Sequence, residues 1–241
     1  MKKEEAIKIM SECAKRYHDN LEGKNVLFLF GSPQCPEFFE VTFLPRNFQH
    51  LTGVELMGRI TSSVDFYDRC RKERLNTSDF AMPPRGMAEV KLTVLPQLMS
   101  IHKSARMVGD YNNSKPVLYT EKLAGNITAC MGFIHGNKYY MPNTALKNDI
   151  RDIVGQQKRV IATFRKSVKA LTYAELCYAA KGIDLSVVPF PDVVTYRQEE
   201  LGKDASTEKP SIRVQLQAFR EVNSNDAPIC SEEKHQTELN R

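Results

Sequence analysis

The sequence predicts a mixed protein of the α+β class, in which helices predominate before about residue 102 and short strands follow. A helical spacing of apolar residues near the N-terminus supports the first part of this prediction. Four short β-like segments between residues 106 and 141, separated by turn-forming residues, support the second. The composition is that of an ordinary folded protein, with 41% hydrophobic and 26% charged residues among 241.

The first predicted elements are a helix and a hairpin. Apolar residues recur at intervals of three and four along residues 4–20, so this segment should form a helix that ends near Gly23. The continuous apolar run at residues 26–30 has the length of a strand, and residues 38–44 form a second strand that returns beside it. This hairpin delivers the chain to a polar cluster at residues 46–50.

Two further helices are predicted before residue 105. Ser62 has the form of an N-cap, because Asp65 lies three residues later and can reach back to its backbone N–H. The helix that follows carries a basic run at residues 69–74, which either faces solvent or tracks a phosphate backbone. Another helix is expected over residues 88–102, where Pro96 indicates a kink or a break.

The later part of the chain is predicted to be an antiparallel meander. Its strands are expected at residues 106–111, 117–120, 126–134 and 138–141. Pro142 should then open a short helix through about residue 152. Residues 159–166 are expected to form a last strand, and residues 172–180 a closing helix.

Charge and pattern divide the chain into two regions. Residues 1–185 are predicted to form one domain, and residues 186–241 a polar tail that is flexible or docks on a partner. Only residues 212–216 alternate like a strand in this tail. Of 34 basic and 29 acidic residues, 7 and 9 follow residue 196, so residues 1–196 carry a net charge of +7. This excess favours an anionic partner such as RNA or DNA, and a solvated basic surface is the alternative.

Several classes of function have no support in the sequence. The six cysteines are scattered singly, without zinc-ligand spacing, so free thiols are expected and a zinc or disulfide scaffold is not. Motifs for phosphate loops, dinucleotides, metalloproteases, serine hydrolases and calcium loops do not occur, so no cofactor and no metal are predicted. No apolar run approaches the roughly 20 residues of a membrane helix, and the charged N-terminus is unlike a signal peptide. We therefore expect a cytoplasmic protein that has no membrane partner.

One stretch, residues 43–54, gathers several kinds of polar group within a few residues, although its pattern alone does not define a reaction. It holds an imidazole at His50, a guanidinium at Arg46 and an amide at Asn47, bracketed by apolar residues. Metal-free RNA cleavage needs a base for the 2′-hydroxyl, an acid for the leaving oxygen, and cations or amides for the phosphate. His50 is the natural acid/base candidate because its ordinary pKa lies near neutrality. A hydrogen-bonded structural histidine and a helix-capping Asn47 are the alternatives.

The other candidate residues are spread along the chain. Cationic ones would hold phosphates, amides and hydroxyls would donate hydrogen bonds, and tyrosines would stack on unpaired bases. Each also has a structural interpretation, as a helix cap, a core residue or a strand end. These residues are Lys91, Arg165 and Lys166; Thr52, Asn143 and Thr144; and Tyr67 and Tyr111.

Several short motifs occur in a recognisable order. They are residues 47–53, Phe66-Tyr67, Lys91-Leu92 before Leu95, residues 142–144 with 149–151, and residues 164–166. Together they span about residues 5–180 and resemble a nuclease-like family of phages and integrative mobile elements in the barnase, EndoU, colicin and RelE-like fold group. The hairpin at residues 26–44 is extra to a minimal fold of this kind, and the tail lies outside the match.

The resemblance implies a barnase/RelE-like fold, in which N-terminal helices precede an antiparallel sheet whose exposed face binds RNA. It also implies a metal-independent endoribonuclease, as a toxin-like effector or defence protein of a mobile element. His50 would be the general acid/base, Lys91 and Lys166 would stabilise the phosphate and the transition state, and Thr144 would donate a hydrogen bond. The RNA contacts would be Arg46, Asn47, Tyr111 and Arg165.

Two alternatives stay open at this point. The first is an inactive module of the same fold that binds nucleic acid or a partner protein. The second is a DNA-handling accessory of mobile-element transfer. The C-terminal tail is expected to be either flexible or a docking segment for an inhibitor or another partner protein.

Overall fold

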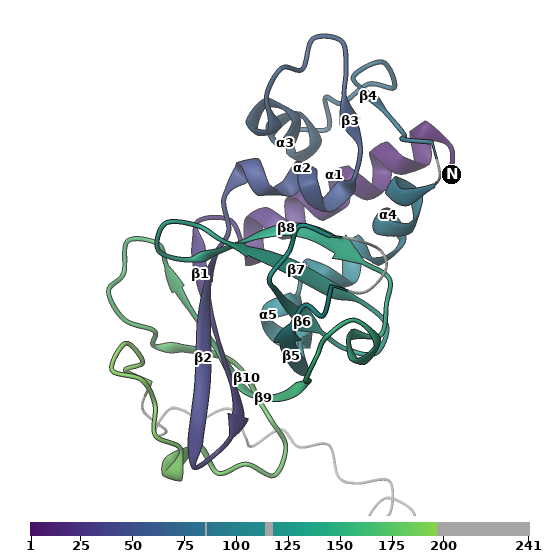
Figure 1. Cartoon of the computed structure of the whole chain (residues 1–241). Coiled ribbons are helices and arrows are strands. Elements are labelled where there is room, and N and C mark those ends of the chain that lie inside the picture. The colour runs from purple at the N-terminus through teal and green to yellow at the C-terminus, as the bar shows by residue number, and fades with distance from the viewer. Residues whose placement is uncertain (85, 114–117, 197–241) are drawn as a thin grey trace, which may run out of the picture. The chain divides into compact units, whose positions relative to one another are not determined.

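A computed structural model describes residues 1–84, 86–113 and 118–196 (Figure 1). Within these ranges the helices are α1 (Lys3–Asn20), α2 (Phe48–Thr52), α3 (Ser63–Arg71), α4 (Met87–Leu98) and α5 (Ile101–Ser104). The strands are β1 (Lys24–Ser32), β2 (Cys35–Thr42), β3 (Glu55–Leu56), β4 (Phe80–Ala81), β5 (Met107–Asp110), β6 (Lys122–Gly125), β7 (Cys130–His135), β8 (Tyr140–Leu146), β9 (Lys158–Ser167) and β10 (Glu175–Ala179). Short 3-10 turns lie at Pro45–Asn47, Ile150–Asp152 and Leu185–Val187.

The first helix and the hairpin form as their patterns predict. α1 buries Met10, Ala14 and Tyr17 on one face. β1 pairs with β2 along one edge and with β9 along the other, and both of its faces are buried in apolar clusters, which requires an unbroken apolar sequence. Its even-numbered residues, such as Phe28, enter the core beneath the helices, and its odd-numbered ones, such as Leu27, enter a second core.

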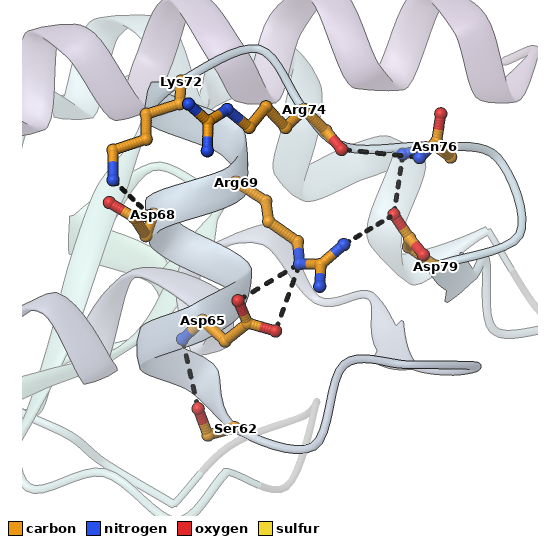
Figure 2. A network of polar contacts seen from close by, with 8 residues as sticks. All are labelled: Ser62, Asp65, Asp68, Arg69, Lys72, Arg74, Asn76 and Asp79. Carbon is orange, nitrogen blue, oxygen red and sulfur yellow. Dashed lines mark hydrogen bonds and ion pairs between the residues drawn. The ribbon is translucent and has the colours of Figure 1, made fainter.

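A polar network fixes the start of α3 (Figure 2). The Ser62 hydroxyl accepts a hydrogen bond from the Asp65 backbone N–H at 3.1 Å, which confirms the predicted N-cap. Arg69 Nε donates to both carboxylate oxygens of Asp65 at 3.1 Å, and Arg69 also lies 4.0 Å from the buried carboxylate of Asp79. Asp79 in turn accepts from the Asn76 backbone N–H at 2.9 Å. Arg69 therefore ties the first turn of α3 to the loop that follows the helix.

The basic run of α3 has acidic partners on the same helix. Lys72 Nζ lies 2.8 Å from the Asp68 carboxylate and Arg71 lies 3.4 Å from it. These pairs at helical spacing lower the net positive charge of this surface. Of the two interpretations of this run, a solvated helix face agrees better with these contacts.

Eight strands share one mostly antiparallel sheet, in the order β1-β2-β8-β7-β6-β5-β9-β10. β1 also pairs with β9, so the pairings form a closed circuit that runs from β1 through the other strands to β9 and back to β1. β10 pairs with β9 outside this circuit. β2 and β8 are parallel and meet at a single bridge, Val41 with Tyr140. The early hairpin, expected as an addition to a minimal fold, is thus paired into the sheet on both of its sides. β3 and β4 form a separate two-stranded sheet.

Three apolar clusters stabilise the described part of the chain. The largest lies under α1 to α4, which gather near β8 in Figure 1, and includes Tyr17, Phe48 and Phe66. The second surrounds Phe164 and contains Val188, which belongs to the first part of the expected tail. The third lies around Ile150. Residues 197–241, including the alternating residues 212–216, lie outside the described residues.

Two segments expected to be helical are strands. The segment after Pro142 continues β8 as far as Leu146, and only the 3-10 turn Ile150–Asp152 follows it. A register shift between β7 and β8 at Pro142 interrupts the ladder, which is where a strand tolerates a residue without an N–H. Residues 175–179 pair with β9 as β10 and do not form the expected closing helix. The prediction of a strand at residues 117–120 is also wrong in the part that the structure describes. Residues 118–120 do not form a strand, and the chain enters the sheet later, as β6.

No helix in the described ranges combines the length and apolar character that a membrane crossing requires.

Candidate functional site

A cleft of about 440 Å³ opens beside α2, α3 and the β7–β8 hairpin. α2 packs directly against β8, so both walls rest on the rigid core. No carboxylate occurs among the described residues that line the cleft, and its walls are therefore neutral to positive. These residues are Arg46, Asn47, His50, Ser63, Tyr119, Ile134, Met141, Pro142 and Asn143.

The short helix α2 and the turn before it hold the imidazole and the guanidinium at the cleft. Phe48 and Leu51 are fully buried and fix one side of the helix. The side chains of Arg46 and His50 are left exposed on the other side. Asn47 is buried, and its side-chain oxygen accepts the Leu44 backbone N–H at 3.1 Å. The side-chain amide of Asn47 therefore caps the backbone at Leu44 and also lines the cleft.

Lys91, from α4, lies next to His50. Its Nζ donates a hydrogen bond to the His50 backbone oxygen at 3.2 Å, near the C-terminal end of α2, where a cation is stabilised by the helix dipole. Gly53 makes room for the lysine: a Cβ at this residue would lie 2.7 Å from Lys91 Cδ, and its φ of +73° is left-handed. Burial lowers the pKa of Lys91. Burial, and then the charge of Lys91, lower the pKa of His50, which favours the neutral imidazole that can accept a proton.

A β-bulge presents Asn143 to the cleft. The register between β7 and β8 shifts here and leaves Asn143 without a cross-strand partner. Its side-chain oxygen accepts from Thr120 Oγ1 at 3.3 Å, and its amide donates to the Tyr119 backbone oxygen. Gly132 keeps this space open, because a Cβ there would lie 2.7 Å from Thr120 Oγ1. Bulges commonly re-aim side chains beside functional sites.

The structure brings together part of the predicted set. Arg46, Asn47 and His50 line the cleft and Lys91 adjoins His50. Thr144 follows the bulge on β8 and is only 6% exposed, so it lies behind the wall that Asn143 forms.

Three other predicted residues make contacts elsewhere. Arg165 forms an ion pair with Glu175, and this hydrogen-bonded partner raises the pKa of the guanidinium. Lys166 is 8% exposed, and its Nζ donates to the Leu171 backbone oxygen at 2.9 Å. Tyr111 is 8% exposed and packs in the third apolar cluster. None of the three is among the described residues that line the cleft.

Two lining residues with polar side-chain groups, Ser63 and Tyr119, were not predicted from the sequence. Ser63 sits in the first turn of α3, and its hydroxyl donates to Gln49 Oε1 at 3.2 Å. Tyr119 is 86% exposed at the edge of the cleft. A serine after an N-cap serine carries no distinguishing signal. Tyr119 was included in a predicted strand at residues 117–120, and its exposure follows from the irregular structure of residues 118–120.

A protein-family model described as phage-Barnase-EndoU-ColicinE5/D-RelE like nuclease4 matches residues 9–182. The chain belongs to this nuclease family. The match includes every residue that lines the cleft, and it confirms the resemblance carried by the sequence motifs. Membership indicates nucleic acid as the class of substrate. No curated protein and no solved structure matches the chain.

In the described ranges, no group of three or more His, Cys, Asp and Glu side chains is placed to hold a metal ion.

Proposed function

We propose that this member of the nuclease family is an endoribonuclease that cleaves RNA in the cleft, with His50 as the general acid/base. The observation that carries the proposal is the placement of an imidazole and a guanidinium in one cleft whose described lining has no carboxylate. The lowered pKa of His50 supports it. A phosphodiester is an anion and enters such a cleft without like-charge repulsion. An imidazole that is neutral at pH 7 can take the proton of a 2′-hydroxyl.

The proposed reaction is an internal transesterification. His50 removes the 2′-hydroxyl proton, the 2′-oxygen bonds to phosphorus, and the bond from phosphorus to the 5′-oxygen breaks. The imidazolium then returns its proton to the 5′-oxygen, which leaves a 2′,3′-cyclic phosphate and a 5′-hydroxyl. Arg46 would hold the phosphate, because its side chain is exposed and its guanidinium makes a weak contact with Met141 Sδ at 3.7 Å, which a phosphate can replace.

Other polar groups have supporting roles in this proposal. Lys91 acts through His50 as a positioning residue that holds the C-terminal end of α2 and keeps the imidazole neutral. Asn143 takes the hydrogen-bonding role predicted for Thr144, because Asn143 is the one of the two that lines the cleft. Lys166 and Arg165 have other contacts and are left out of the proposed reaction.

The test is cleavage of labelled single-stranded RNA and total RNA in EDTA, comparing the wild type with His50→Gln. We expect the variant to lose about 10²- to 10⁴-fold in rate, the usual contribution of a general acid/base. His18→Gln is the matched control, because His18, on α1, is also a half-exposed imidazole and is paired with Glu22, which follows the helix. Cleavage that survives in His50→Gln, or that falls equally in the control, would remove His50 from the reaction.

A non-catalytic module that binds nucleic acid is the second candidate. It is favoured by one observation: among the described lining residues, His50 is the only imidazole and no carboxylate is present, so one group must serve as both base and acid. Equal inactivity of the wild type and His50→Gln, with RNA still bound, would select this alternative. Tighter binding of duplex DNA with a steep salt dependence would instead indicate a role in DNA handling.

A further inference from the structure

Tyr119 is an exposed aromatic residue on a fixed backbone. Its side chain is 86% exposed, although it lines the cleft. Its backbone oxygen accepts from the side-chain amide of Asn143, at the bulge of β8. The next residue, Thr120, is buried, and its hydroxyl donates to the Phe133 backbone oxygen on β7 at 3.1 Å. The ring is thus presented to solvent by a segment tied to both strands of the β7–β8 hairpin.

The cleft therefore combines two groups that suit the two parts of a nucleotide. The Arg46 guanidinium suits the phosphate, and an exposed phenol ring suits the face of a base. The tyrosines considered for stacking from the sequence do not offer a free face, since Tyr111 is 8% exposed and Tyr67 is 3% exposed. Tyr119 is the lining residue whose ring is available.

We infer that Tyr119 stacks on an unpaired base and makes the cleft selective for single-stranded RNA. The inference rests on the proposed function, because both use the same cleft. In a duplex each base is covered on both faces by its neighbours, so a side chain reaches it only after the stack is opened. A single-stranded segment offers a base face next to each phosphate, and stacking on an aromatic side chain tolerates any base.

Intrinsic fluorescence provides a direct test, because the chain contains no tryptophan. Tyr119→Trp creates a single reporter at the cleft. Leu171→Trp is the matched control, since Leu171 is 88% exposed and does not line the cleft. The probes are three oligonucleotides of 2′-O-methyl RNA, which a 2′-hydroxyl mechanism cannot cleave: a single strand, the same strand in a duplex, and an abasic single strand.

The single strand should quench Tyr119→Trp fluorescence, and the duplex and the abasic strand should not. Leu171→Trp should respond to none of the probes. In binding titrations with the single strand, Tyr119→Ala should raise the Kd about 5- to 150-fold, the range that loss of one stacked base gives, and Tyr119→Phe should stay within about twofold. With the abasic strand, Tyr119→Ala should bind as the wild type does.

Three results would overturn the inference: equal quenching by single strand and duplex, an unchanged Kd in Tyr119→Ala, or no binding of any probe by the wild type. The two proposals fail separately. Quenching by the single strand in a protein that cleaves no natural RNA would leave stacking intact and refute the nuclease. Cleavage of RNA by the wild type, with no quenching in Tyr119→Trp, would refute stacking and leave the nuclease proposal intact.

Discussion

Lowering the pH from 7 to 4 should destabilise the fold through His102 by about 3 kcal/mol. The imidazole is completely buried between α5 and the sheet, and neither ring nitrogen has a hydrogen-bond partner in the described part of the chain. Burial lowers its pKa to about 4. The charges of Arg165 and Lys103 add to this shift and Glu175 opposes it. The folded protein therefore keeps His102 neutral over a pH range in which a free histidine becomes charged.

The sign follows from proton binding in the two states. In the unfolded chain His102 binds a proton near its ordinary pKa of about 6.5, and in the folded chain only near 4. Stability from this group is fully present above about pH 6.5 and is lost as the pH falls towards 4. A difference of about 2.5 pKa units, at about 1.4 kcal/mol each, is worth about 3.5 kcal/mol in full. At pH 4 the folded-state imidazole is half protonated, so about 3 kcal/mol of this has been lost.

The assay is urea unfolding of the wild type and of His102→Leu at several values between pH 7 and pH 4. Leucine removes both unpartnered nitrogens, so we expect the variant to be about as stable as the wild type at pH 7. The wild type should then lose about 3 kcal/mol more than the variant, which moves its midpoint by about 1 M urea or more relative to it. Other groups titrate in both proteins and cancel in the difference. Parallel pH profiles would refute the reasoning.

Three further changes test the structure around the cleft. Gly53→Ala should destabilise the fold by about 1 to 3 kcal/mol in urea unfolding, because φ is +73° and the added methyl meets Lys91; no loss would contradict this packing. Lys91→Met should raise the pKa of His50, measured by NMR titration, and leave it below 6.5 because burial persists; a fall would contradict the assigned cause. Ser62→Ala should cost about 1 kcal/mol by loss of the cap on the Asp65 N–H, and an unchanged melting temperature would count against it.

The sequence predicted the parts of the fold that local chemistry decides. The amphipathic period of α1, the apolar run of β1 and the cap at Ser62 each determine their own element. β10 could not be read in this way. Its glutamate, leucine and alanine favour a helix, and a register shift between Leu176 and Tyr178 disturbs the alternation that marks a strand. Pairing with β9 overrides these local preferences.

Some individual residues of the site could be predicted from the sequence, but the contacts that bring the site together could not. His50 and Arg46 stand out because they are close in sequence on one short segment. Lys91 reaches His50 only through the packing of α4 on α2, a contact that spans 41 residues. Asn143 reaches the cleft through a bulge, and Tyr119 through an irregular segment, neither of which leaves a periodic signal. Such placements depend on tertiary structure.

The pairing of β1 with β9 has a consequence for synthesis of the chain. Residues 24–30 find their partner at residues 160–167, more than a hundred positions later. Until that segment leaves the ribosome, one side of β1 stays open, and its buried run around Phe28 is available for wrong contacts. Native contacts so distant along the chain also slow folding. A nascent chain of this protein is therefore expected to expose one edge of β1 until residues 160–167 have been synthesised.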